Sequence, residues 1–166
     1  MPIPSDQFKH VMRQWASGVS IVTMQTEERR HGLTISGFVS ISPEPPLVLI
    51  SVGQELTSDS LLQASGAYAI SFLRDDQREL SDRFAGRLGD VDRFEGLITH
   101  TEATGAPILD DCLAWLDCRV VATHVVGDHT LFIGEVVAAG VNNPAVAAVP
   151  LVYWNADYRK LERIPL

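Results

Sequence analysis

The sequence has no run of about 18 uncharged apolar residues, and its first residues, MPIPSDQFKH, lack the positively charged start and apolar core of a secretion signal. We therefore expect neither a membrane span nor export. Basic residues are also few, since 13 Lys and Arg stand against 21 Asp and Glu, for a formal net charge of −8. Proteins that bind nucleic acid or anionic membrane surfaces need clustered Lys and Arg. The excess of acidic residues therefore favours a small-molecule ligand.

Motifs for several common chemistries are missing. No two glycines lie two positions apart, so there is no G-x-G-x-x-G fingerprint, and the phosphate loop G-x-x-x-x-G-K-[ST] is absent. The sequence contains no C-x-x-C, H-E-x-x-H or G-x-S-x-G, and its five histidines show no metal-ligand spacing with a supporting carboxylate. Rossmann, P-loop, hydrolase and metalloenzyme classes therefore have no supporting feature, and we expect no bound metal.

Cysteine is scarce: only Cys112 and Cys118 are present. We expect both to be buried free thiols, which fits the reducing cytoplasm. The length of 166 residues and the hydrophobic content of 46% are those of a globular protein. We expect one domain that covers residues 1–166.

An amphipathic helix is predicted near the N-terminus. Ser5 is placed to cap its start, and Gly18 is placed to end it. Between them, four apolar residues recur at helical spacing. They are Phe8, Val11, Met12 and Trp15.

Strands are predicted for most of the remaining chain. Segments rich in β-branched and aromatic residues are 19–26, 32–42, 46–52, 67–73 and 150–154, and the segments 113–125 and 130–139 form a hairpin. There is little alternation of strands with helices. This pattern predicts a mainly β protein built as an antiparallel barrel, rather than a doubly wound sheet.

Two short helices are predicted between the strands. Ser58 or Ser60 can cap the first, which Gly66 ends, while Asp76 opens a capping box in the second, which Gly86 ends. A helix N-terminus is also a natural phosphate site. Ser58 and Ser60 are therefore either phosphate contacts or simple helix caps.

Hydroxyl side chains are dense between residues 34 and 51. They are Thr34, Ser36, Ser40, Ser42 and Ser51. The first four share one parity and would line one face of a single strand. Such a wall suits a ligand with many acceptors, such as the edge of a flavin ring, but an ordinary solvent-facing strand explains it equally well. Gly37, within the row, permits a bulge or the close approach of a ligand.

Several stretches carry a resemblance to a known family. They are SPEPPLVLISV, YAISFL, LSDRFAG, DRFEG and GDHTLFIGEV, of which the last is the most specific. In this order, from about Phe8 to Tyr158, they resemble the flavin reductase-like family of short-chain reductases that serve two-component monooxygenases. The resemblance implies an FMN-binding split β-barrel of Greek-key type, usually a homodimer. It also implies that a hydride passes from NADH or NADPH to FMN or FAD, and that reduced flavin then leaves for an oxygenase component.

Carried over position by position, the resemblance implies a set of flavin contacts. The residues assigned to the flavin ring and ribityl chain are Thr34, Ser36, Gly37 and Ser40. Those assigned to the path from ring edge to phosphate are Ser51, Val52, Ser58 and Ser60. Those that close the phosphate side are Phe84, Ala85, Gly86 and Arg87. His129 matches the histidine that lies beside the nicotinamide, where it can hydrogen-bond the carboxamide or the pyrophosphate.

The C-terminal stretch VYWNADYRKL departs from the family pattern Tyr-His-x-Gly-x-Tyr. Tyr153 and Tyr158 match it, but Trp154 stands at the histidine position and Ala156 at the glycine position. Trp154 either stacks against flavin or adenine or packs in a dimer interface.

Two other hypotheses remain open at this point. A non-catalytic flavin- or haem-binding protein on the same barrel would retain its ligand tightly and would not oxidise NADH. The second hypothesis is a related enzyme that acts on pyridoxine phosphate or on a deazaflavin. An enzyme for pyridoxine phosphate normally needs clustered Arg and Lys, which this chain lacks.

Overall fold

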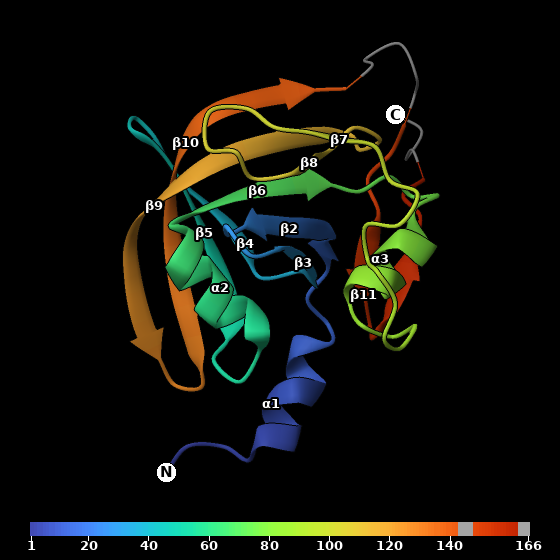
Figure 1. The fold of residues 1–166 in the computed structure, drawn as a ribbon. Helices are drawn as coiled ribbons and strands as arrows, with labels where there is room; N and C mark the ends of the chain where they lie inside the picture. The colour runs from blue at the N-terminus through green and yellow to red at the C-terminus, as the bar shows by residue number, and fades with distance from the viewer. Residues whose placement is uncertain (143–147, 163–166) are drawn as a thin grey trace.

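The computed structural model describes residues 1–142 and 148–162. Its main body is a curved antiparallel sheet in the order β3-β2-β6-β9-β10-β5-β4 (Figure 1). These strands are β2 (Ser20–Gln25), β3 (Arg30–Ile35), β4 (Phe38–Pro43), β5 (Pro46–Gly53), β6 (Ala67–Phe72), β9 (Ala114–Val126) and β10 (His129–Val141). The described residues also form α1 (Ser5–Met12), α2 (Thr57–Ser65), α3 (Arg78–Phe84), β1 (Ser17–Gly18), β7 (Thr99–His100), β8 (Ile108–Leu109), β11 (Val152–Trp154) and β12 (Asp157–Arg159). The predicted mainly β, antiparallel architecture and the long β9–β10 hairpin are confirmed.

The split in the sheet lies between β3 and β4. These strands are consecutive in the chain, but β3 pairs with β2 at one edge of the sheet and β4 pairs with β5 at the other. The backbone N–H of Ser51, in β5, donates to the carbonyl oxygen of Gly37 at 3.0 Å and fixes the connection. The continuous strand expected over 32–42 is therefore wrong, because the chain changes edges at Ser36 and Gly37.

The hydroxyl row expected on one face is also interrupted. Thr34 belongs to β3, whereas Ser40 and Ser42 belong to β4, where the pairing with β5 shifts register between these two serines. Ser40 lies opposite Val48, which is buried, and Ser42 lies opposite Leu47. A spacing of two residues keeps side chains on one face only along an uninterrupted strand, so the shared parity does not give a shared face here.

The two larger of three apolar clusters support most of the sheet. The first fills its inner side beneath α2 and includes Ile50, Tyr68 and Phe132, each fully buried. The second lies beside α3 and is built around Phe84 and Phe94, whose rings meet edge to face with centroids 5.2 Å apart. These clusters hold the sheet and α3 in a fixed arrangement.

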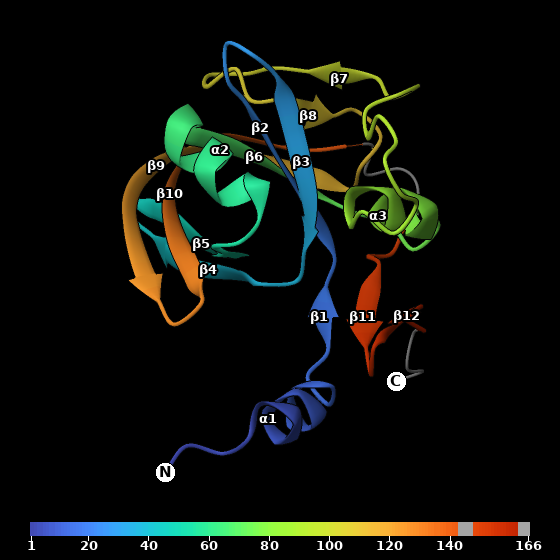
Figure 2. The ribbon, with the colours of Figure 1, turned by 60° about the horizontal axis from the view of Figure 1, so that its bottom comes forward.

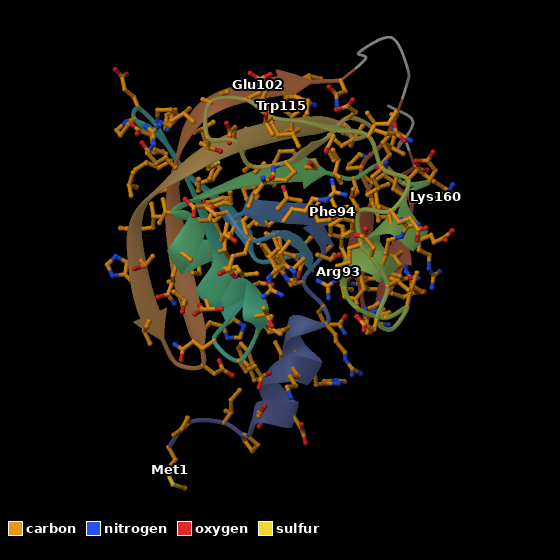
Figure 3. All side chains as sticks on the ribbon, viewed as in Figure 1. Met1, Arg93, Phe94, Glu102, Trp115 and Lys160 are labelled. Carbon is orange, nitrogen blue, oxygen red and sulfur yellow. The ribbon has the colours of Figure 1, made fainter. Side chains whose placement is uncertain are left out.

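Arg93 ties the second cluster to the edge strand β3. Its guanidinium donates to the carbonyl oxygen of Gly32 at 2.6 Å, and Figure 3 places Arg93 and the buried Phe94 between the sheet and α3. A Cβ added to Gly32 would lie 2.6 Å from the ring of Phe84. The glycine therefore allows α3 to pack directly against β3.

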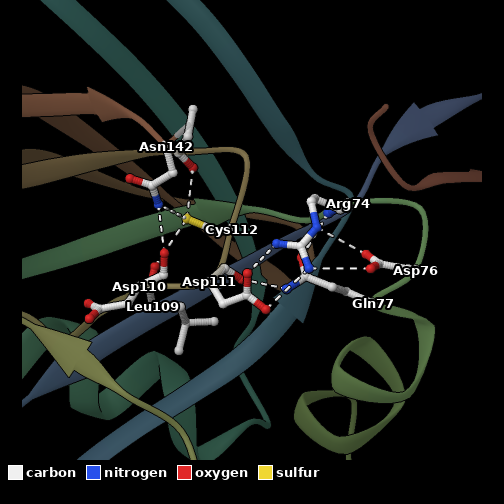
Figure 4. Close-up of polar contacts among 9 residues, drawn as sticks. Arg74, Asp76, Gln77, Leu109, Asp110, Asp111, Cys112 and Asn142 are labelled. Atoms are coloured by element: carbon white, nitrogen blue, oxygen red, sulfur yellow. Dashed lines mark hydrogen bonds and ion pairs between the residues drawn. The ribbon is translucent and has the colours of Figure 1, made fainter. Parts of the chain in front are cut away.

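A polar cluster fixes the start of α3 (Figure 4). Arg74 forms ion pairs with Asp111 and, at 3.1 Å, with Asp76. Gln77 accepts a hydrogen bond from the backbone N–H of Arg74 at 2.8 Å and donates one to the carbonyl oxygen of Asp111. Gln77 occupies the cap position of α3, so the capping box expected at Asp76 is wrong, because that carboxylate is engaged by Arg74. Gly86 follows α3 with a φ of 73°.

The caps of α2 are predicted correctly at one end only. Gly66 adopts a left-handed conformation with a φ of 63° and ends the helix as expected. Leu56 occupies the N-cap position, so Ser58 and Ser60 both lie inside the first turn and cap nothing. The reason is that the helix begins at Thr57, earlier than the serines indicate.

The first helix is shorter than its apolar spacing predicts. Pro4, with extended backbone, occupies its N-cap position, Ser5 is the first helical residue, and the helix ends at Met12. Its apolar side chains, and that of Trp15 just beyond it, are exposed to solvent rather than buried against the described part of the chain. No helix within residues 1–142 and 148–162 is long and apolar enough to cross a membrane.

The turn between β11 and β12 holds an alanine in an unfavourable backbone conformation. Trp154 pairs with Asp157, and the two residues between them, Asn155 and Ala156, have φ values of 52° and 61°. Two positive φ values define a turn that favours Asn-Gly. Asn tolerates this conformation, whereas Ala is strained in it.

We predict that Ala156→Gly stabilises the protein. The left-handed conformation costs Ala about 1–2 kcal/mol, and the extra freedom of Gly in the unfolded chain offsets part of the gain, so the net gain in unfolding free energy is about 0.5–1 kcal/mol. Urea denaturation of the variant and the parent protein measures it. Gly66→Ala, at a position with the same sign of φ, is the matched control and should lower stability; a loss of stability in Ala156→Gly would contradict the prediction.

Candidate functional site

Two connected hollows lie where the sheet is split. The smaller, of about 160 Å³, is bounded by β3, α3 and the β11–β12 hairpin. Its lining residues are Val19, Thr34, Ile35, Ser36, Ser81, Ala85, Arg87, Tyr153 and Tyr158. The larger, of about 570 Å³, lies between α1, the β3–β4 connection and the β11–β12 hairpin. Ser36 and Tyr153 line both hollows, which therefore form one continuous cleft.

Hydrogen bonds fix the polar wall of the smaller hollow. Thr34 Oγ1 donates to the carbonyl oxygen of Ser81 at 2.7 Å, and the Tyr158 hydroxyl lies 2.9 Å from both Ser81 Oγ and Asp82 Oδ1. Arg87 donates to Asp82 Oδ1 at 2.7 Å, and this hydrogen bond raises the pKa of Arg87. The wall therefore presents a permanent cation beside hydroxyl groups, an arrangement that suits an anionic, oxygen-rich ligand.

The structure brings five of the predicted flavin contacts to this cleft. They are Thr34, Ser36, Gly37, Ala85 and Arg87. They come from β3, from the β3–β4 connection and from the segment after α3, which lie far apart in the sequence. Their proximity depends on the packing of α3 against β3.

Three predicted positions have side chains that do not reach the cleft. Val52 and Phe84 are each 1% exposed and belong to the two apolar clusters. Ser58 is 3% exposed, and its hydroxyl lies 3.0 Å from Nε2 of His31. These side chains serve packing, so any contact that they make with a ligand has to come from backbone atoms.

Four more predicted residues lie outside the cleft lining. Ser40 is exposed on the edge strand β4, and Ser60 donates a hydrogen bond within the first turn of α2. Gly86 follows α3, next to Arg87. Trp154 is 38% exposed, and the guanidinium of Arg159 lies over its ring, 5.6 Å from the centroid.

Ser51 and His129 both lie on the outer face of the sheet. Leu131 pairs with Ser51, and His129 lies two positions before Leu131 on the same strand. Alternate residues of a strand share a face. The intervening Thr130 and the neighbouring Val52 are buried on the inner face, so Ser51, Leu131 and His129 point outward.

His129 is held at the tip of the β9–β10 hairpin. Its Nδ1 lies 2.7 Å from Asp128 Oδ1, and because a carboxylate only accepts hydrogen bonds, Nδ1 is the donor. This hydrogen bond is the main cause that lowers the pKa of Asp128. The other ring nitrogen, Nε2, is then the acceptor in the neutral ring. Gln54 secures the tip, since its side chain donates to the carbonyl oxygen of His129 at 3.2 Å and its backbone N–H to that of Asp128 at 3.0 Å.

The cleft and His129 are linked through the adjacent strands β4, β5 and β10, with Gly37 just before the start of β4. Gly37 contacts Ser51 in β5, and β5 pairs with β10, which begins at His129. The separation across the strands is two strand spacings, or about 10 Å, and His129 lies two residues further along β10 than Leu131, the partner of Ser51, which adds a displacement of about 7 Å along the strand. A planar ligand lying on the outer face can therefore contact Gly37 and Ser51 while a second group stacked on it contacts His129.

The cleft fits a flavin on the outer face beside Gly37. Gly37 is exposed and lines the larger hollow, so its backbone, which no side chain covers, is accessible to a ring edge. The hydroxyl of the exposed Ser36 can contact the acceptor atoms of the ring, and Arg87 is available for an anionic group.

Some residues of the cleft were not predicted as site residues. The sequence indicates Tyr153 and Tyr158 only through the C-terminal pattern and does not indicate Ser81, although Ser81 lies three residues before Phe84 on the buried face of α3. Lys9 and Arg13 line the larger hollow, and no local signal in the sequence connects α1 with the β11–β12 turn.

Comparisons with known proteins agree with this geometry. The flavin reductase like domain family matches residues 12–162. An NADH-dependent flavin reductase from Rhodococcus is 36% identical over 157 residues, covering 93% of this chain and 85% of the relative. The reductase component of 4-hydroxyphenylacetate 3-monooxygenase from Thermus thermophilus is 35% identical over 159 residues, covering 94% of this chain and 96% of the relative. The structure of the Streptomyces globisporus NADH:FAD oxidoreductase SgcE6 in complex with NAD and FAD fragments superposes with a TM-score of 0.87 at 31% identity, covering 98% of this chain and 96% of that one.

The fold and the cleft define a split-sheet reductase with an open ligand site at the sheet edge. The chain belongs to the flavin reductase-like family, and the protein is a flavin reductase.

We predict that stability falls as pH drops below neutrality because of His31. Burial, and then the positive charges of Arg93 and Arg29, lower the pKa of His31 to about 4 from 6.5. As pH falls from 6.5 towards 4, the unfolded chain therefore gains a proton that the folded protein does not, and stability is lost in this window. The midpoint of thermal unfolding as a function of pH measures the effect.

The control for this prediction is His31→Asn, which removes the titrating group. Its unfolding midpoint should fall less steeply between pH 6.5 and 4 than that of the parent protein. Parallel pH profiles for the two proteins would show that His31 contributes nothing.

A second prediction separates the cleft from the exposed edge strand. Ser36→Leu should weaken FMN binding by about tenfold or more, because a bulky side chain enters the cleft wall. Ser40→Leu, outside the cleft lining, is the matched control and should have a much smaller effect. Quenching of flavin fluorescence measures both affinities, and thermal unfolding of the apoprotein checks that both variants fold. Equal losses of affinity would contradict this assignment of the cleft.

Proposed function

We propose that residues 1–166 form a single catalytic domain that transfers a hydride from NADH to FMN or FAD and releases reduced flavin to a flavin-dependent oxygenase. The observation that carries this proposal is the cleft at the sheet split, where Ser36, Gly37 and Arg87 come together beside the outward-facing Ser51. The Rhodococcus relative supports NADH as the donor, and the Thermus relative supports an oxygenase as the recipient. The contacts assigned to the ring and ribityl chain serve FMN and FAD alike.

The protein contributes positioning more than acid or base chemistry. Bound flavin supplies the hydride acceptor. Thr34, Ser36, Gly37 and Ser51 would hold its ring, and His129 would be left to contact the nicotinamide. His129 then holds the carboxamide through Nε2, the acceptor left after Nδ1 donates to Asp128. Such orientation of two reactants contributes much of the rate of a bimolecular step.

A homodimer is part of the proposal. Val39 and Ile41 on β4 and Val126 at the hairpin tip are 53%, 45% and 55% exposed. Exposed apolar side chains are typical of a surface that another chain covers. A second copy of the chain on this side would also shield the flavin from water.

We place the protein in the cytoplasm. The thiols of Cys112 and Cys118 are both free and buried, as the sequence predicts, and burial raises the pKa of Cys112 to about 11 and that of Cys118 to about 12. Such unreactive thiols persist in a reducing compartment.

The first experiment is to follow absorbance at 340 nm with purified protein, NADH and FMN in air, and to repeat it with FAD and with NADPH. We expect NADH oxidation that depends on added flavin. Tight retention of flavin or haem without turnover would instead support the binding-protein hypothesis, which the names of the relatives do not favour.

We predict that His129→Ala raises the KM for NADH by about tenfold, the value of one lost hydrogen bond to a polar ligand, and leaves the KM for FMN nearly unchanged. Steady-state kinetics with each substrate varied in turn measures both constants. Thr123→Ala, on the same hairpin but away from its tip, is a control that should leave both constants unchanged. An equal rise in the two constants for His129→Ala would remove the proposed role.

A further inference from the structure

The larger hollow beside α1 has a charge opposite to that of the whole protein. Lys9 and Arg13 line it, and no Asp or Glu from the described residues does. The chain as a whole carries a net charge of −8. A groove with only positive charges in an acidic protein attracts anions such as phosphate groups.

The same hollow offers open aromatic surface. Trp15 is 72% exposed and Phe8 is 55% exposed, and both line the groove. Exposed aromatic rings beside cations are the elements with which proteins bind a base and its phosphates. Neither feature is used by the contacts assigned to the flavin ring.

The groove is held together by specific backbone contacts. The N–H of Asn155, in the β11–β12 turn, donates to the carbonyl oxygen of Arg13 at 2.9 Å. The N–H of Trp15 donates to the carbonyl oxygen of Met12 at 3.1 Å, which extends the helical turn beyond α1. Figure 2 shows α1 at the end of β1, and the β11–β12 hairpin beside β1, with which β11 pairs. These contacts hold the C-terminal end of α1, which carries Arg13, beside the β11–β12 turn.

The groove also continues directly from the flavin cleft. Ser36 and Tyr153 line both hollows. The smaller hollow, at about 160 Å³, cannot enclose a dinucleotide, whereas the groove of about 570 Å³ has the size of a small-molecule site. A ligand whose ring lies against Gly37 can therefore extend its remaining half towards Lys9 and Arg13.

We propose that this groove binds the adenosine diphosphate half of a dinucleotide, with Lys9 and Arg13 on the diphosphate and Trp15 stacked on the adenine. The proposal rests on the proposed function, which supplies two dinucleotides with this half, FAD and NADH. None of the side chains of α1 is buried in the described structure, so packing does not explain this helix. The proposal gives it a role in substrate binding.

The test is calorimetric titration of the protein with ADP alone, which requires no turnover. The parent protein should bind ADP, and Lys9→Ala combined with Arg13→Ala should weaken binding by about tenfold or more. Trp15→Ala should also weaken it, by about tenfold for the loss of one stacked base. Arg29→Ala removes a cation from the turn between β2 and β3, at the opposite end of the molecule from α1 (Figure 2), and should change nothing.

Kinetics with the Lys9 and Arg13 double variant distinguish the two sources of the ADP group. A rise in the KM for FAD but not for FMN assigns the groove to flavin, and a rise in the KM for NADH with either flavin assigns it to the nicotinamide nucleotide. Absence of ADP binding to the parent protein, or unchanged ADP affinity in the double variant and in Trp15→Ala, overturns the proposal. Lack of flavin-dependent NADH oxidation in the parent protein refutes the proposed function instead, and the titration with ADP remains informative.

Discussion

The hydrogen bond from the Ser51 N–H to the Gly37 carbonyl oxygen fixes the place where the chain passes from one edge of the sheet to the other. Without this change of edge, β3 and β4 would be one strand, and the sheet would have no split. The polar wall on β3, the exposed backbone at Gly37 and the outward-facing Ser51 all follow from it. The ligand cleft is thus a consequence of sheet topology, to which α3 and the β11–β12 hairpin add side chains.

The strands and the main hairpin could be predicted because their signals are local. GDHTLFIGEV combines a turn with a run of β-branched and apolar residues, and the structure turns at Gly127 and Asp128 before β10 begins at His129. Gly66 was recognised as the end of α2 for the same reason, since a left-handed residue at a helix terminus is a property of one position. The family resemblance supplied the expected chemistry, because its motifs extend along nearly the whole chain.

Features that depend on distant segments could not be predicted in this way. Ser58 reads as a helix cap, yet its hydroxyl is used by His31, 27 residues earlier in the chain. The hydroxyl row reads as one face, yet a change of sheet edge and a register shift divide it. The apolar spacing of α1 indicates a buried face, but in the described structure that face is exposed. Two cations of this N-terminal segment, Lys9 and Arg13, line a groove that the β11–β12 hairpin also lines. In each case tertiary contacts override the local pattern.

Gln54 connects the hairpin tip with the segment that leads into α2. Its side chain and backbone hold the carbonyl groups of His129 and Asp128, while the N–H of Leu56 is bonded to the carbonyl oxygen of Gly53. The tip and this segment therefore form one cooperative unit. A ligand that immobilises the hairpin tip at His129 will slow hydrogen exchange at the amide of Gln54 as well, so that its binding is registered in the segment that follows β5.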